Sequence, residues 1–125
     1  MNSIVGFARL GIVLKHWRPG MTNREIDALI AEHFMGFMSA NAVTGMGTKN
    51  DFVFYLPHYS TDIAAAWEVV RVFSTWPWCF TSSGDTFKFD LGYEGERYSA
   101  IAETAPMAIC LAALKAKGVD VEREV

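Results

Sequence analysis

Cysteine is scarce in this sequence of 125 residues, which contains only Cys79 and Cys110. Neither belongs to a Cys-x-x-Cys pair and the three histidines are scattered, so the clustered ligand spacing of a structural zinc site is missing. Both cysteines lie in apolar runs, where a free thiol behaves as a small buried hydrophobic group. We therefore expect no metal, no cofactor, two buried thiols and a reducing, cytoplasmic location.

Basic residues and long apolar runs are also few. The chain has 11 Lys and Arg against 14 Asp and Glu, for a net charge of −3. Polymeric nucleic acids normally require a basic surface, so we expect no DNA or RNA partner, whereas a free nucleotide needs only one local site. No apolar run approaches the roughly 20 residues that span a bilayer, so we expect no membrane partner.

The sequence does contain enough apolar material for one core, since 51% of its residues are hydrophobic and 14% aromatic. We expect this single domain over residues 21–118, followed by a charged tail over residues 119–125 that frays. Its start is marked by Met21, which immediately precedes Thr22-Asn23-Arg24-Glu25, a capping box typical of a helix N-terminus.

Residues 1–20 differ from the rest of the chain. They lack an early basic side chain and a small-residue cleavage pattern, which argues against a secretory signal. We interpret them as an N-terminal extension from an upstream start that the fold does not need. The alternative is an added short helix or edge strand over residues 4–14 that packs on the domain or mediates self-association.

Apolar spacing of three and four predicts a first helix from Asn23 to about Phe34, ended by Gly36, with His33 half-buried on its apolar face. Residues 37–56 lose this periodicity and contain several turn-forming residues, which predicts a loop or mobile flap.

A second helix is predicted from Thr61 to Phe73, with Ser60 as its N-cap and Asp62 in its first turn. The predicted buried face of this helix consists of Ile63, Ala66, Trp67, Val70 and Phe73.

Three strands follow, over residues 78–82, 86–93 and 97–103, and the turn signals between them predict an antiparallel meander. A last helix begins after Thr104 and ends before Gly118. Taken together, these elements predict an α+β protein, a compact α/β sandwich in which a three-stranded antiparallel meander packs with about three helices.

The candidate ligand site is the segment that leads into the second helix. A helix N-terminus presents unpaired N–H groups and a partial positive charge, which suit an anionic group near His58, Tyr59, Ser60 and Thr61. Tyr59, Trp76 or Trp78 would stack on a base. The side chains that could complete an anion site are Arg24, Lys49 and Arg97. The alternative interpretation is a capped core helix with Trp76 and Trp78 filling the junction between helix and sheet.

Catalysis finds little support in the sequence. His58 with Asp62, Ser60 or Cys79 is the one imaginable constellation, and it matches no known spacing rule. We assign no catalytic residue, and a hydrolase that uses His58 and Asp62 is the least favoured hypothesis.

Several motifs, in order, resemble the phage ABA-sandwich domain, a family of small bacteriophage and prophage proteins. The matching segments are Met21 to Asp27, Met35-Gly36, Tyr59 to Ile63 leading into Ala66-Trp67, and Thr104-Ala105-Pro106 before Ala108 to Leu111. The chain departs from the family in having Phe37 where Trp is usual. The resemblance implies an α/β sandwich of phage or prophage origin, acting in the host cell cytoplasm, and no agreed biochemical activity.

Three functional hypotheses follow. The first is a phage accessory protein that acts by binding, either to a host protein or to itself as a homo-oligomer, because exposed Trp and Tyr dominate interface hot spots. The second is a sponge that sequesters a small nucleotide signal of host anti-phage defence at His58 to Thr61. The third is the hydrolase.

Overall fold

The computed structural model describes residues 21–73, 75–93 and 95–119. In this part the chain forms three helices and two three-stranded antiparallel sheets, so the predicted α+β class is confirmed. The elements in chain order are α2 (Asn23–Phe34), β1 (Ser39–Asn41), β2 (Met46–Lys49), β3 (Phe52–Tyr55), α3 (Ile63–Val72), β4 (Trp78–Ser83), β5 (Thr86–Tyr93), β6 (Glu96–Ala102) and α4 (Ala105–Ala116). The expectations for residues 1–20 and 120–125 lie outside the described residues.

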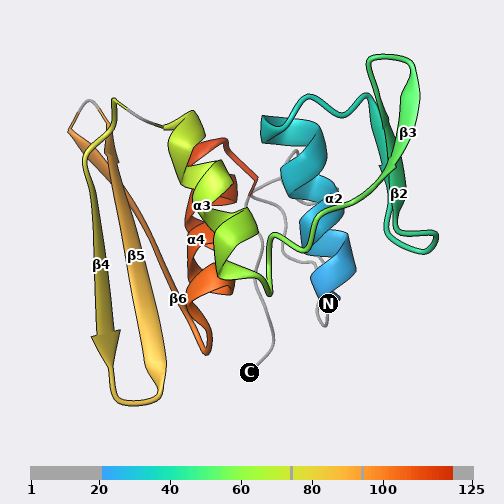
Figure 1. Cartoon of the computed structure of the whole chain (residues 1–125). Helices are drawn as coiled ribbons and strands as arrows, with labels where there is room; N and C mark the ends of the chain where they lie inside the picture. The colour runs from blue at the N-terminus through green and yellow to red at the C-terminus, as the bar shows by residue number, and fades with distance from the viewer. Residues whose placement is uncertain (1–20, 74, 94, 120–125) are drawn as a thin grey trace, which may run out of the picture.

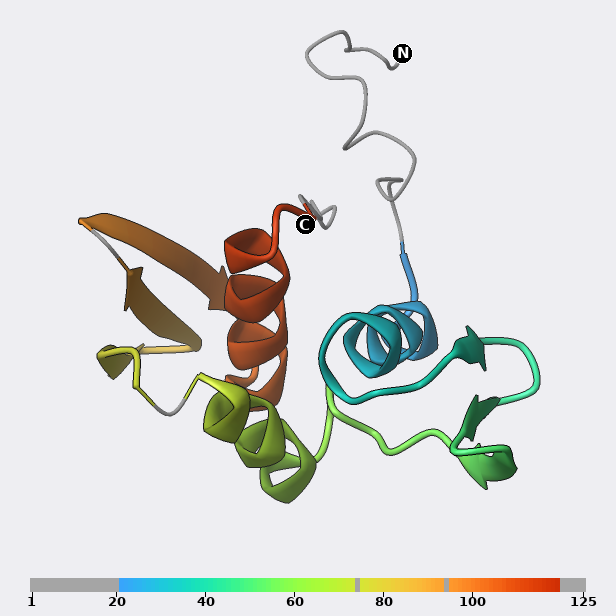
Figure 2. The same cartoon turned by 90° about the horizontal axis from the view of Figure 1, so that it is seen from above.

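The helices form the middle of the molecule and each sheet lies on the outside (Figures 1 and 2). Helix α4 packs against β5 and β6 of the sheet β4-β5-β6, and α3 lies beside α4. Helix α2 follows on the other side of this pair, and the small sheet β1-β2-β3 lies beyond α2. The small sheet therefore projects from the helical core.

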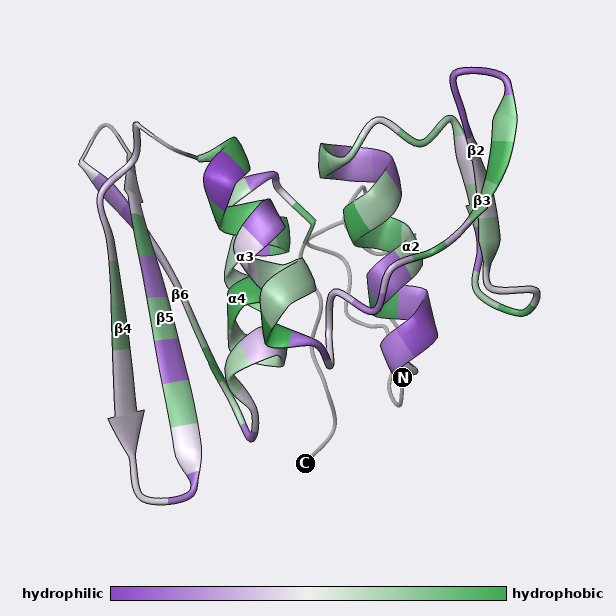
Figure 3. Cartoon of the chain, viewed as in Figure 1, coloured by the Kyte–Doolittle hydropathy of each residue, from purple (hydrophilic) through white to green (hydrophobic). Residues whose placement is uncertain are grey.

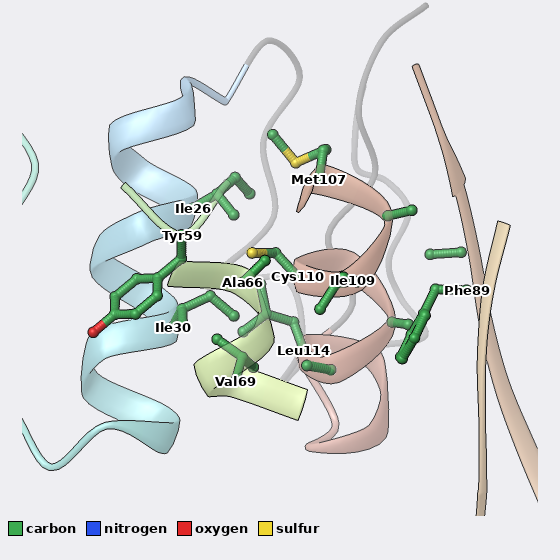
Figure 4. Close-up of a cluster of buried hydrophobic side chains, with 14 of the residues drawn as sticks. Ile26, Ile30, Tyr59, Ala66, Val69, Phe89, Met107, Ile109, Cys110 and Leu114 are labelled. Atoms are coloured by element: carbon green, nitrogen blue, oxygen red, sulfur yellow. The ribbon is translucent and has the colours of Figure 1, made fainter. Parts of the chain in front are cut away.

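The core is built around α4 and gathers apolar side chains from every helix and from the β5 and β6 strands (Figure 4). Cys110 is fully buried there, as predicted. Val119, which we expected in a fraying tail, also belongs to this core: it is buried and its N–H donates to the Leu114 carbonyl at 2.8 Å. Burial removes the apolar side chain of Val119 from water, which is more favourable than leaving it exposed in an extended tail.

The first and last helices have the predicted ends. Thr22 and Glu25 form the capping box of α2, and His33 is half-buried near the end of that helix. Thr104 caps α4, with Pro106 in its first turn. Gly118 follows this helix with a φ of +91°, a conformation that favours glycine.

The start of α3 corrects the sequence interpretation. Asp62, and not Ser60, is its N-cap, because the Asp62 carboxylate accepts the N–H of Ala64 at 3.1 Å. Ser60 is buried and its polar groups bind α2 instead. With the helix beginning at Ile63, that residue lies on its exposed side, so its predicted burial was wrong. Trp67 is half-buried and packs against the core.

The meander β4-β5-β6 has the predicted antiparallel topology, with strand ends within a residue of the prediction. Phe80, Phe89 and Ala100 are in register and share the face toward the helices. Cys79 lies on the opposite, solvent face beside Asp90 and is exposed, so its predicted burial was wrong. Successive residues of a strand face opposite sides of the sheet, and this alternation places Cys79 in solvent although its neighbours in sequence are apolar.

Residues 37–56 are not the loop that we predicted, because they contain all three strands of a second sheet, β1-β2-β3. Strands β2 and β3 are joined by a two-residue turn, Asn50 and Asp51, with φ of 54° and 69°. Two consecutive residues with positive φ define a type I′ turn, whose twist matches that of a β-hairpin. Gly47 permits the sheet to approach the body, since a Cβ there would lie 2.5 Å from the Ser39 carbonyl oxygen and 2.7 Å from the Phe37 ring.

Candidate functional site

Asp27 is the polar centre of the predicted ligand segment. Its side chain is fully buried on α2, with one oxygen 2.7 Å from the guanidinium of Arg24 and the other 2.8 Å from the N–H of Ser60. The Ser60 hydroxyl donates to the Asn23 carbonyl at 3.2 Å. A buried carboxylate is tolerated only when such partners compensate its lost hydration, so these contacts fix the segment to α2.

Arg24 connects three parts of the chain. Besides Asp27, its guanidinium donates to the Leu56 carbonyl at 3.0 Å, and at longer range to Pro57 at 3.4 Å and Gly45 at 3.5 Å. The side chain is 26% exposed. Arg24 therefore lies beside the candidate segment, as an anion site would require, but its donors already serve intramolecular acceptors.

His58 is exposed and lies directly on Arg24, with its Nδ1 3.2 Å from the guanidinium. Arginine has donors and no acceptor, so in this contact the imidazole Nδ1 accepts. The ring proton of the neutral imidazole is then on Nε2.

Tyr59 is buried, and its ring lies beside Ile26 and Ile30 of α2 (Figure 4). Burial raises the pKa of its phenol to about 12, with a further contribution from the negative charge of Asp27. Burial also raises the pKa of the Cys110 thiol, again with a contribution from Asp27. Neither group is ionised at neutral pH, so neither is a nucleophile there, and their burial keeps both away from a ligand in solution.

The backbone N–H groups before α3 have partners within the chain. The N–H of Ser60 donates to Asp27, and those of Thr61 and Asp62 donate to the His58 carbonyl at 3.2 and 2.8 Å. The Ala64 N–H donates to the Asp62 cap. Of the predicted segment, His58 and Thr61 are the exposed side chains, whereas Tyr59 and Ser60 are buried.

Trp76 and Trp78 belong to a different part of the molecule. The Trp76 ring lies 4.7 Å from that of Phe73, after the end of α3, and is half-buried. Trp78 begins β4, is 48% exposed, and its ring lies 5.2 Å from Trp67 and 5.7 Å from Phe89. The structure therefore does not bring Trp76 and Trp78 to His58, which contacts Arg24 of α2.

The other candidate side chains are also dispersed. Lys49 lies over the Phe37 ring at 5.7 Å, and Arg97 lies on β6. Cys79 is on β4, on the far side of α3 and α4 from α2 (Figure 1). Over residues 21–73, 75–93 and 95–119 no three His, Cys, Asp or Glu side chains cluster as metal ligands would. No helix in this same part is long and apolar enough to cross a bilayer.

Strand β3 presents an unusual apolar surface, and sequence analysis had placed this strand inside a predicted loop. All four residues of β3 are large, apolar and exposed, with 66% of Phe52, 61% of Val53, 47% of Phe54 and 80% of Tyr55 accessible. The strand stands out as an apolar stretch on the small sheet (Figure 3). Four strand-forming residues directly after Asn50-Asp51 were the signal for it.

Comparison with known proteins agrees with this architecture. The family described as the phage ABA sandwich domain matches residues 28–114, so the chain belongs to that family. Among solved structures, the chain is similar to a phage protein from Bacillus cereus ATCC 14579, with 27% identity and a TM-score of 0.72 over 82% of this chain and 94% of that chain. Comparison with curated proteins finds no match.

Proposed function

We propose that this phage-family protein acts in the host cytoplasm as an accessory protein by binding another protein, and that β3 is the binding strand. The observation that carries the proposal is the run of four exposed apolar residues over Phe52–Tyr55. Soluble proteins seldom leave such a contiguous apolar area without a partner. Tyr55, the most exposed of the four, belongs to a residue type enriched at interface hot spots.

The position of β3 supports the same function. It is the edge strand of the sheet β1-β2-β3, and only its β2 side is paired within the described residues. Natural edge strands are normally protected by a charge, a proline or a bulge, and the four residues of β3 contain no charge and no proline. An unprotected edge suits binding by strand addition.

The alternative of nucleotide sequestration receives less support from the geometry. The N–H groups of Ser60, Thr61 and Asp62 already donate within the chain, and Arg24 already serves several acceptors. An anion would have to displace these contacts. The hydrolase alternative loses both of its candidate nucleophiles, since Ser60 is buried and Cys79 lies on β4, away from His58.

A photo-crosslinking residue at position 55 of the full chain, expressed in bacteria, tests the proposal. Thr81 is the matched control position, because it is exposed on β4, the edge strand of the other sheet. We expect a discrete protein adduct from position 55 that position 81 does not give. No adduct from position 55, or the same adducts from both positions, would overturn binding through β3.

A further inference from the structure

We infer that the partner of β3 is a second copy of this chain, whose own β3 pairs with it antiparallel to join the two small sheets into one six-stranded sheet. The inference rests on the proposed function, and adds to it the identity and register of the partner. Three properties of the strand carry it: the direction of its backbone groups, its lack of charge and its exposed area.

The backbone groups of two residues of β3 point to the open edge. The N–H of Leu56 donates to the Gly45 carbonyl at 2.9 Å, which makes Met46 and Tyr55 a non-hydrogen-bonded pair of the β2-β3 ladder. Pairs alternate along an antiparallel ladder, so the N–H and C=O of Tyr55 and of Val53 face away from β2. Four polar backbone groups thus lie ready for another strand.

These groups define one symmetric register. Val53 of one copy exchanges both hydrogen bonds with Tyr55 of the other copy, and the reverse, because these are the residues whose polar groups face outward. Phe54 then lies opposite Phe54 of the second copy, on the two-fold axis, as a non-hydrogen-bonded pair. Aromatic and β-branched residues opposite one another are the pairs that stabilise antiparallel sheets.

The chemistry of the strand suits a copy of itself. Two-fold pairing brings two copies of the same strand together, so a strand with charges of one sign would repel itself, whereas β3 has no charged residue. From the exposed fractions, the four residues of β3 in one copy, backbone included, offer roughly 500 Å². Two copies together offer on the order of 1,000 Å², which is near the roughly 1,200 Å² at the low end of specific interfaces.

Oxidative cross-linking of variants with one exposed cysteine tests the register, since Cys110 is buried. Both variants are made in a background of Cys79→Ser, since Cys79 is exposed. Cysteines in Phe54→Cys would face each other across the axis, within the Cα range of about 4.4–6.8 Å that a disulfide needs. Phe52→Cys is the matched control, because the two copies of that residue, on the same strand, would lie about 13 Å apart.

We expect a covalent dimer from Phe54→Cys and at least tenfold less from Phe52→Cys. Equal cross-linking of the two variants would overturn the register, and no dimer from Phe54→Cys would overturn the pairing.

Sedimentation velocity of the otherwise unmodified full chain tests the dimer without cysteine chemistry. We expect a concentration-dependent dimer that Val53→Lys converts to monomer and that Thr81→Lys, with the same added charge on β4, leaves intact. A wild-type monomer at every concentration would overturn the inference. If position 55 still cross-linked a host protein in that case, the proposed function would stand and only the identity of the partner would fall.

Discussion

The carboxylate of Asp27 holds the backbone N–H of Ser60 at 2.8 Å, across 33 residues of sequence and in a fully buried position. This contact explains why Ser60 does not cap α3, since its amide and hydroxyl both bind α2. The same carboxylate orients Arg24, which reaches Leu56 and His58. One buried acid thus fixes the segment that enters α3 and the end of the small sheet.

We expect Asp27→Asn to lower the free energy of unfolding by about 2 kcal/mol, because it removes the charge that the partly buried Arg24 and the Ser60 N–H contact. Chemical denaturation with urea measures this change. Glu68→Gln is the control, since Glu68 and Arg71 form an exposed pair at 3.4 Å and its loss should cost under about 0.5 kcal/mol. Similar losses in the two variants would contradict the role assigned to Asp27.

Tyr59 gives the protein a pH-dependent stability at the alkaline end. The pKa of its phenol is raised from 10.0 to about 12 by burial in the folded state. Below pH 10 the phenol is neutral in both states and its stabilising contribution is fully present. Between pH 10 and about 12 the unfolded chain releases the proton first, so this contribution is lost as the pH rises.

Comparison of wild type with Tyr59→Phe isolates this effect from other alkaline titrations. We expect the difference in unfolding free energy between the two proteins to be constant below pH 10 and to shift against wild type above it. Absorbance at about 295 nm should show a phenol titration near pH 12 that Tyr59→Phe lacks. A stability difference that does not change with pH would contradict the burial of an unionised phenol.

Gly47 should tolerate no side chain. Its Cβ would lie 2.5 Å from the Ser39 carbonyl oxygen and 3.1 Å from Leu56, and the backbone oxygen cannot move away without breaking the β1-β2 register. We expect Gly47→Ala to cost about 2 kcal/mol by overpacking, measured by urea denaturation. Gly92→Ala is the control in the other sheet, because a Cβ there first meets Pro77 at an ordinary 3.5 Å. Equal stability of the two variants would contradict the close approach.

The fold was largely predictable because its helices and meander are encoded by local signals. The capping box at Thr22 and Glu25, the cap at Thr104 and the alternation along Phe87, Phe89 and Leu91 each act within a few residues. The second sheet escaped prediction because its strands have three or four residues, too few for a period to emerge. Its turn depends on two non-glycine residues with positive φ.

The candidate site was predictable only in part, for a related reason. The sequence marks His58, Tyr59, Ser60 and Thr61 as polar groups at a helix start, but it does not say which of them face solvent. Which of them are buried depends on Asp27 of α2, which accepts the N–H of Ser60. Sequence analysis did not single out Asp27. The apolar run Phe52–Tyr55 was visible in the sequence but was assigned to a loop, and its exposure was not predicted, since four such residues are typical of a buried strand.

By itself, the sequence determined the α+β class, the ends of α2 and α4, the meander and the family, because caps, turns and alternation are short-range properties of the chain. The tertiary structure decided three further features: that Ser60 binds Asp27, that Trp78 lies apart from His58, and that β3 forms an open edge. These features depend on which residues, distant in the sequence, come into contact in the folded protein. Such contacts, and not the residue types alone, set which groups are buried and which hydrogen-bond partners they have.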